Sequence, residues 1–360
     1  MPKRFILFAA LSLSTAAPAS QQADQAWTLQ QREQLSTWLK LAPQEGLTVP
    51  TRADHTAQAL ELARAILLGN GEAKKQAGWN IADQDQAIDL NMRLAAALAR
   101  NDLNEFLTEL RPRNPQYEAL RLALRTEIDP VRKAALIRNL ERWRWMPRDL
   151  GHRYLLVNAA GYELGLWEND RKIAQWRVIV GKRKTPTPVF SSRVTGVTVN
   201  PWWDVPPSIV AESVGALIRR NPAEARRRGY VWGGGSYRQR PGSSNALGQM
   251  KLVMPNPYKV YLHDTPNKAL FEQQTRAFSH GCIRVDQALS LAATLLDRSI
   301  DGEVKSGRTV TLPLGDPLPV YVTYFTADVG AAGAIEFHED IYGRDARMSD
   351  GSSFASGCTV

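Results

Sequence analysis

A cysteine and two histidines are spaced so that they could support nucleophilic catalysis. Cys282 closes the run Ser279, His280, Gly281, Cys282, and His263 lies further upstream. A thiol is a weak nucleophile until it loses its proton, and a nearby imidazole can accept that proton. The pattern therefore indicates a cysteine nucleophile with one of the two histidines as its base.

His263 is expected at the end of a strand. Residues 258–263 favour a strand, and Asp264 begins a turn that continues to Pro266. Alternation along this strand places Lys259, Tyr261 and His263 on one face. The end of a strand is a rigid place to hold a catalytic base.

Gly281 lets the backbone turn tightly beside the thiol. Such a turn could present the amide N–H of Cys282, with that of a neighbour, to a developing oxyanion. A metal site built from His263, His280, Asp264 and Cys282 is the alternative, but the closely spaced Cys/His pairs typical of zinc sites are missing. We therefore expect neither a metal nor another cofactor.

The elements that must position these residues indicate an α+β fold. Residues 24–147 carry apolar side chains at helical spacing and predict an all-helical scaffold domain. Residues 152–345 predict a mostly antiparallel β domain that carries the reactive residues. The helices are expected over residues 27–41, 57–68, 85–98, 117–123 and 131–143, with a short one near Phe106. The strands are expected over residues 154–157, 162–167, 173–180, 194–199, 308–312, 320–325 and 335–338. A further amphipathic helix is expected over residues 286–296, with Asp286 as its N-cap.

Residues 206–248 form an insertion in this β domain. The segment is rich in Gly, Pro and Arg, and long loop-rich insertions are uncommon unless they are functional. Trp203, Trp232 and Tyr237 argue against disorder, which is poor in aromatic residues. We interpret the segment as a lid over the site, with a disordered surface loop as the alternative.

The ends and the charge of the chain indicate an exported protein. Lys3 and Arg4, an apolar run and Ala17-Pro-Ala19 are typical of a secretory signal over residues 1–19. Removal of this signal lowers the formal net charge from +9 to +7. The remaining positive charge favours an anionic partner such as a wall polymer. Export argues against nucleic acid as that partner. The other cysteine, Cys358, lies in a predicted tail over residues 346–360. A bridge to Cys358 would consume Cys282, so we interpret Cys282 as a free thiol.

Several motifs resemble the YkuD-type L,D-transpeptidases, in particular the larger YcbB-like branch. That family has an upstream His on a strand followed by Ser/Thr-His-Gly-Cys at this spacing. The resemblance covers about residues 140–345. It rests further on the segments 141–147, 187–190, 200–206, 245–248 and 340–344. Many members have Asn two residues after the Cys, where this chain has Arg284, so a role of that Asn is not carried over.

The resemblance implies roles for the site residues. Cys282 would be the nucleophile and His263 the base, oriented by the backbone carbonyl of Asp264. His280 would help to stabilise the thiolate. The remaining implied residues surround the substrate and the oxyanion: Tyr261, Gly281, Ser279, Arg284, Trp203 and Trp232. Arg284 would hold local structure or a substrate carboxylate.

The resemblance also implies a function in the cell wall. Cys282 would attack the bond between meso-diaminopimelate and D-Ala in a tetrapeptide stem, release D-Ala, and pass the acyl group to an amine of another stem. The crosslink would join two position-three residues, in the periplasm of a Gram-negative-type cell, and carbapenems would acylate the same thiol. The partners would be donor and acceptor stem peptides, and wall-synthesis proteins at the helical domain, with no membrane span after signal removal.

Two rival functions stay open at this point. An L,D-carboxypeptidase or amidase on the same fold would share the first half-reaction, so motifs do not separate it from a transpeptidase. A non-catalytic wall-binding protein would not need the pair of Cys282 and His263. Papain-like peptidases place the Cys before the His, which is the reverse of the order here.

Overall fold

The computed structural model describes residues 27–52, 54–83, 85–330 and 332–349. The predicted signal over residues 1–19 and Cys358 lie outside these ranges. Within these ranges the chain divides into two compact units, one of residues 27–43, 47–67 and 89–111 and one of residues 44–46, 68–88 and 112–349. No helix in the described ranges is both long and apolar enough to cross a membrane.

The first unit is helical, as the apolar periodicity predicts. It contains α2 (Leu29–Leu41), α3 (His55–Leu68), α5 (Leu90–Arg100) and α6 (Leu103–Glu109). A capping box starts α2, because the Thr28 hydroxyl accepts from the Gln31 amide and the Gln31 side chain accepts from the Thr28 amide. The buried face of these helices includes Leu35, Leu62, Ile66, Leu94 and Leu107.

One predicted helix in this unit begins later than its apolar pattern indicates. The helix expected from residue 85 starts at Leu90, after a 3₁₀ turn over Asp85–Ala87. Asp89 is the reason, since its carboxylate accepts from the Met92 amide and caps the helix there.

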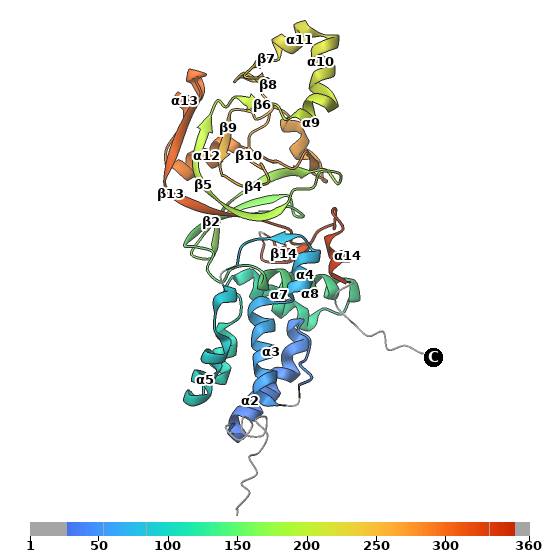
Figure 1. The fold of residues 1–360 in the computed structure, drawn as a ribbon, viewed down its shortest axis with the longest axis vertical. Coiled ribbons are helices and arrows are strands. Elements are labelled where there is room, and N and C mark those ends of the chain that lie inside the picture. The colour runs from blue at the N-terminus through green and yellow to red at the C-terminus, as the bar shows by residue number, and fades with distance from the viewer. Residues whose placement is uncertain (1–26, 53, 84, 331, 350–360) are drawn as a thin grey trace, which may run out of the picture. The chain divides into compact units, whose positions relative to one another are not determined.

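The second unit joins several helices to a large sheet (Figure 1). Its helices are α4 (Gly71–Gln76), α7 (Pro115–Thr126), α8 (Pro130–Arg144), α12 (Ala288–Leu296), α13 (Asp301–Ser306) and α14 (Arg344–Ser349). The end of α8 is deeply buried: Trp143 stacks on Phe325 with ring centroids 4.8 Å apart. The tail predicted over residues 346–360 begins inside α14, in which Met348 is buried.

The main sheet follows the predicted meander and then closes on itself. Its strands are β1 (Trp79–Asn80), β2 (Arg153–Asn158), β3 (Glu163–Glu168), β4 (Arg171–Gly181), β5 (Val189–Val199), β9 (Met250–Val253), β10 (Leu262–His263), β11 (Ala277–Ser279), β12 (Ile283–Val285) and β13 (Val310–Thr323). The neighbours run β5-β13-β2-β3-β4-β12-β10-β9, and β9 pairs again with β5. Most pairs are antiparallel, but four are parallel: β2 with β13, β10 with β12, β1 with β5 and β11 with β4. A closed sheet has one filled face, here lined by Val197, Leu252, Leu262, Ile283 and Val285.

Two features of this sheet differ from the sequence prediction. The strands expected over residues 308–312 and 320–325 are one long strand, β13, which pairs with β5 through an irregularity between Pro313 and Leu318. Asp286 does not cap α12, where Gln287 holds the N-cap position at φ 48°. One oxygen of the Asp286 carboxylate instead binds the Arg177 guanidinium at 2.8 and 3.1 Å, and its other oxygen accepts from the amide of the adjacent Gln287 at 3.0 Å.

The predicted insertion is an ordered subdomain rather than a loose loop. It contains α9 (Pro207–Ile209), a π-helical turn over Val210–Val214, α10 (Gly215–Arg220) and α11 (Pro222–Arg227). A small sheet of β6 (Trp203–Asp204), β7 (Tyr230–Gly233) and β8 (Ser236–Gln239) completes it. Figure 1 shows this subdomain in yellow. The remaining hairpin of the second unit pairs β14 (Ala327–Val329) with β15 (Ile335–Phe337).

Candidate active site

The parallel pair of β10 and β12 brings the two predicted reactive residues onto one face. His263 lies opposite Arg284, Leu262 lies opposite Ile283, and the Ile283 amide donates to the Tyr261 carbonyl at 2.9 Å. Because side chains alternate along a strand, His263 and Arg284 point away from the filled face, and Cys282 comes just before β12 on the same side. The site is thus built on the outer face of the sheet.

Lys259 departs from the predicted alternation. Its φ of +55° breaks the extended backbone, and the strand begins only at Leu262. The Lys259 side chain is exposed, while its carbonyl oxygen lies 4.0 Å from the Cys282 sulfur.

His263 is held as a neutral base. Its side chain is 4% exposed, and its Nδ1 lies 2.5 Å from the Asp264 carbonyl oxygen. A carbonyl oxygen can only accept, so Nδ1 carries the proton and Nε2 keeps its lone pair. Burial, and then the positive charge of Arg284, lowers the pKa of His263 to about 4, although the carbonyls of Asp264 and Leu247 favour its charged form. The imidazole is therefore unprotonated at neutral pH.

Cys282 carries a free thiol that is also neutral at rest. Burial raises the pKa of this thiol above its ordinary value, against the opposing effects of the Tyr261 backbone and the charges of Arg284 and Lys251. The pKa shifts of both groups favour their neutral forms rather than a thiolate–imidazolium ion pair. Arg284 favours the thiolate and disfavours the imidazolium, so it assists ionisation of the sulfur while keeping the base neutral.

The turn before Cys282 is fixed from both sides. Gly281 has φ +111°, a conformation that residues with a Cβ rarely adopt. The Ser279 hydroxyl donates to the Cys282 carbonyl at 2.5 Å and accepts from the Gly281 amide at 3.0 Å. Since Ser279 occupies the Gly281 amide, the Cys282 amide is the donor of this turn that remains for an oxyanion.

Asp264 is buried and fully engaged. Its carboxylate accepts from the Gln249 amide at 2.8 Å and pairs with Lys268, and its own amide donates to the Met250 carbonyl at 2.9 Å. Gly248 lies against this carboxylate, because a Cβ at that glycine would come within 2.4 Å of it. These contacts hold the carbonyl that orients His263.

Thr187 lies in the segment between β4 and β5 and stabilises the turn that carries Cys282. Sequence reasoning did not single it out for the site. Its hydroxyl donates to the Gly281 carbonyl at 2.9 Å and accepts from the Gly181 amide at 2.9 Å. The Arg344 guanidinium in turn donates to the Thr187 carbonyl at 3.0 Å. The motifs at residues 187–190 and 340–344 thus meet behind Cys282, and the resemblance already marked both segments.

His280 is directed toward the insertion. Its Nε2 lies 2.6 Å from a carboxylate oxygen of Glu212 and 3.2 Å from the Lys182 ammonium. Glu212 also binds Lys182 at 3.1 Å. These three side chains connect the π-helical turn of the insertion to the turn that carries Cys282.

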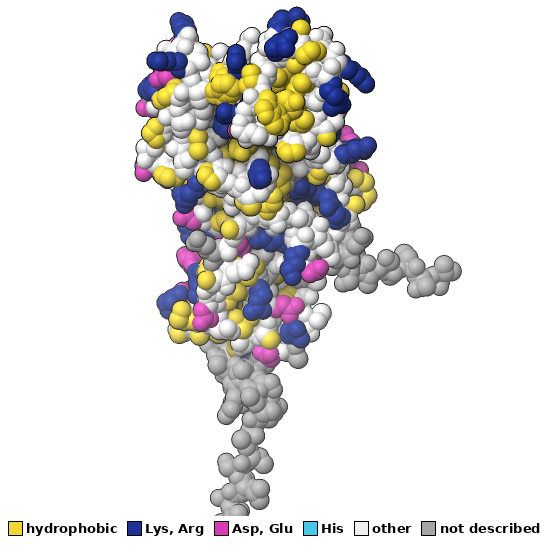
Figure 2. Space-filling model, turned by 45° about the horizontal axis from the view of Figure 1, so that its top comes forward, with side chains coloured by type: hydrophobic (Ala, Val, Ile, Leu, Met, Phe, Trp, Pro, Cys, Tyr) yellow, Lys and Arg dark blue, Asp and Glu magenta, His cyan; other side chains and the backbone are white. Residues whose placement is uncertain are grey.

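Trp203 and Trp232 both lie in the small sheet of the insertion. Trp203 pairs with Gln239 across β6 and β8, and Trp232 packs edge-on against Tyr237 with ring centroids 4.7 Å apart. Trp232 is 65% exposed. Among the described residues, neither ring has a recorded contact with Cys282 or His263. Figure 2 shows Lys and Arg side chains beside a large apolar area at the top of the molecule.

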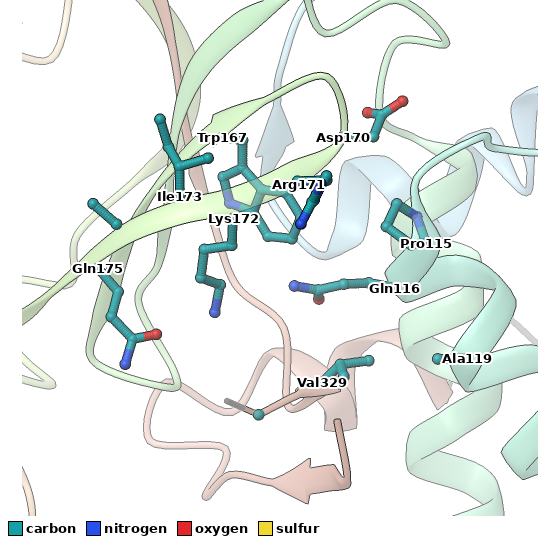
Figure 3. Close-up of a pocket in the computed structure, with 12 residues that line it drawn as sticks. Pro115, Gln116, Ala119, Trp167, Asp170, Arg171, Lys172, Ile173, Gln175 and Val329 are labelled. Carbon is teal, nitrogen blue, oxygen red and sulfur yellow. The ribbon is translucent and has the colours of Figure 1, made fainter. Parts of the chain in front are cut away.

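The cavities of the second unit do not all lie at this site. One of about 650 Å³ lies between α7 and the hairpin of β3 and β4, with Gln116, Trp167 and Lys172 in its wall (Figure 3). Another, of about 470 Å³, is lined by Lys251 and Tyr261. The positive charge of Lys251 and the backbone of Tyr261 both lower the pKa of the Cys282 thiol against the effect of its burial.

The described residues include one cluster that could hold a metal ion. It consists of Asp328, Glu336 and His338 on β14 and β15 and the loop after them, and none of these is a predicted site residue. His338 binds Asp328 at 2.9 Å, and the other Asp328 oxygen accepts from Asn158 at 2.7 Å. His338 and Asp328 therefore form an ion pair, and this pair explains why these side chains lie close together.

Comparison with known proteins agrees with the domain order. Residues 152–322 match the L,D-transpeptidase catalytic domain called YkuD, and residues 19–124 match a family described as a scaffold domain. The chain is similar to a presumed L,D-transpeptidase of Haemophilus influenzae, with 29% identity over 296 residues. The match covers 74% of this chain, and the chain spans 60% of the length of that curated relative.

Solved structures overlap with it more weakly. An L,D-transpeptidase from Mycobacterium smegmatis has a TM-score of 0.29 and 14% identity, covering 48% of this chain and 58% of that one. One from Mycobacterium tuberculosis has a TM-score of 0.26 and 15% identity, covering 48% and 57%. Scores this low carry no argument about the site. The two family matches give the domain order: a scaffold domain precedes a catalytic domain of the YkuD L,D-transpeptidase family.

Proposed function

We propose that this protein forms peptidoglycan crosslinks between the position-three residues of two stem peptides. One observation carries the proposal: Cys282 and His263 lie on the same outer face of the pair β10 and β12, with His263 neutral and its Nδ1 bound to the Asp264 carbonyl. That arrangement supplies a nucleophile and a base that is ready to accept its proton.

The first half-reaction releases D-Ala from the donor stem. His263 Nε2 takes the thiol proton as the Cys282 sulfur attacks the carbonyl between diaminopimelate and D-Ala. The oxyanion accepts a hydrogen bond from the Cys282 amide, and the Tyr261 hydroxyl lies on the same side of the sheet. The C–N bond then breaks, the imidazolium gives its proton to the leaving amine, and a thioester remains on Cys282.

The second half-reaction transfers the acyl group to an acceptor. The side-chain amine of a second diaminopimelate attacks the thioester, His263 takes the proton from that nitrogen, and the proton returns to the departing sulfur. The insertion, with Trp203 and Trp232, would exclude water so that an amine rather than water resolves the thioester.

The location and the partners follow from the same proposal. An exported enzyme would meet its stem peptides in the periplasm, and the positive charge of the chain suits an anionic wall polymer. The helical domain would contact other wall-synthesis proteins. A carbapenem carries a strained amide that Cys282 would open by the same attack; an adduct seen equally on wild type and Cys282→Ala would refute this.

Product analysis separates transpeptidation from its rival. The mature enzyme and its Cys282→Ala variant are each incubated with disaccharide-tetrapeptide, and the products are analysed by mass spectrometry. We expect a crosslinked dimer that has lost one D-Ala, present with wild type and absent with the variant. Tripeptide and free D-Ala without dimer would identify a carboxypeptidase. No change in either sample would leave a wall-binding role.

A further inference from the structure

A row of polar side chains continues the catalytic face across three more strands. Across the sheet, Arg284 pairs with His263, His263 with Lys251, Lys251 with Thr198, and Thr198 with Thr311. Residues that pair directly across strands project to the same face. The row therefore runs without interruption from the strand of the nucleophile to β13.

Three side chains of this row line the cavity of about 470 Å³ described above. Its wall includes Thr198, Lys251, Met254, Tyr261 and Thr311. The Lys251 ammonium lies over the Tyr261 ring, 5.1 Å from its centroid, and the Thr198 and Thr311 hydroxyls are 3.0 Å apart. The volume falls in the range of small-molecule sites and suits a peptide segment of a few residues.

The row contains cations without an acid to balance them. Neither Lys251 nor Arg284 makes a side-chain hydrogen bond or ion pair with any residue in the described ranges. The neighbouring acid, Asp264, is already occupied by Lys268 and the Gln249 amide. Lys251 is thus a positive side chain without an acidic partner in the wall of the cavity, and such a charge attracts an anionic group.

From these observations we propose that Lys251 binds a free carboxylate of the stem peptide in this cavity, and so makes the enzyme select carboxylate stems over amidated ones. This inference rests on the proposed function. Besides the carboxylate of the terminal D-Ala, which leaves with that residue, a stem offers two such groups: the α-carboxylate of the D-glutamyl residue and the side-chain carboxylate of diaminopimelate. Tyr261 places the ammonium, and the two threonine hydroxyls supply partners for the peptide groups.

The test compares three donor stems: one with both carboxylates free, one amidated at the D-glutamyl residue, and one amidated at diaminopimelate. For each stem, kcat/KM for D-Ala release is measured with wild type, Lys251→Met, Lys251→Arg and the exposed control Lys305→Met. We expect wild type to lose about 10- to 100-fold on one amidated stem, as a lost charged hydrogen bond would give. On the free stem, Lys251→Met should have a kcat/KM lower than that of wild type by about the same factor, and amidating that stem should lower it little more. Lys251→Arg should recover part of the kcat/KM that Lys251→Met loses on the free stem. The stem that wild type rejects identifies the carboxylate.

Two results would overturn the inference: wild type that treats all three stems alike, or Lys251→Met that loses equally on every stem. Equilibrium binding of the same stems to Cys282→Ala, with and without Lys251→Met, gives the same comparison without turnover. If no stem is cleaved, the proposed function fails. In that case the binding series alone decides on Lys251: discrimination that disappears in Lys251→Met supports the inference, and equal binding refutes it.

Discussion

At the residue scale, the reaction depends on two groups whose pKa values are displaced in opposite directions. Burial lowers the pKa of His263 to about 4 and raises that of the Cys282 thiol. A thiolate–imidazolium pair would need the reverse displacement. In the proposed reaction these shifts favour general-base catalysis, in which the proton moves as the sulfur attacks.

The pH profile of acylation tests this reading. We expect the rate of Cys282 acylation to rise as the pH increases through about 4, since only neutral His263 can accept the thiol proton. Arg284→Gln removes a nearby positive charge and should move this limb to higher pH, because that charge now lowers the pKa of His263. The rate is measured by intact mass at a series of pH values. A wild-type limb near 6.5, the value for an unperturbed histidine, or a limb that Arg284→Gln does not move, would contradict the reading.

At the scale of elements, the loop before β9 positions the base through Asp264. Gly248→Ala should destabilise the protein and lower kcat, since the new Cβ would meet the Asp264 carboxylate that this loop surrounds. Gly307→Ala is the matched control: Gly307 has φ +65° against +61° for Gly248, with nothing within 4 Å of its Cβ position. The control should lose about 1–2 kcal/mol of unfolding free energy from backbone strain and keep its activity. Denaturant unfolding and turnover are measured together, and equal effects of the two substitutions would count against this role of Gly248.

A second element contact holds the insertion to the nucleophile turn. Glu212→Gln weakens its interactions with His280 and Lys182, so hydrogen exchange over residues 207–220 should become faster. Glu339→Gln breaks another exposed pair, to Arg183 at 2.9 Å, and should leave that segment unchanged. If exchange is the same in wild type and Glu212→Gln, the carboxylate does not restrain the insertion.

Motifs and periodicity predicted much of these elements, and pairing across the sheet explains what they missed. Cys282 and His263 were marked by local motifs, and the helices and strands by apolar periodicity. Lys251 joined the site only because β9 lies beside β10, a long-range pairing that no local pattern encodes. The predicted cap at Asp286 was wrong because Arg177, on a neighbouring strand, binds that carboxylate. Tertiary contacts decided each of these cases.

At the scale of the whole molecule, positive charge is concentrated in the insertion. Residues 206–248 contain seven arginines and two glutamates, without lysine or aspartate. Binding of Cys282→Ala to isolated wall sacculi should therefore weaken as salt increases, measured by co-sedimentation. Arg219→Gln with Arg220→Gln should reduce both the binding and its salt dependence. The exposed pair Arg64→Gln with Arg125→Gln removes the same charge elsewhere and should change binding less. Equal effects would indicate that total charge, rather than the insertion, controls binding.

The acyl-enzyme tests the central claim most directly. The donor tetrapeptide is mixed with wild type, Cys282→Ala and His263→Gln, and each protein is analysed by intact mass and peptide mapping. We predict an adduct equal to the stem minus D-Ala on Cys282 of wild type, none on Cys282→Ala, and formation slowed at least about 100-fold in His263→Gln. An adduct that persists on Cys282→Ala, or that forms at the wild-type rate in His263→Gln, would contradict the assignment of nucleophile and base.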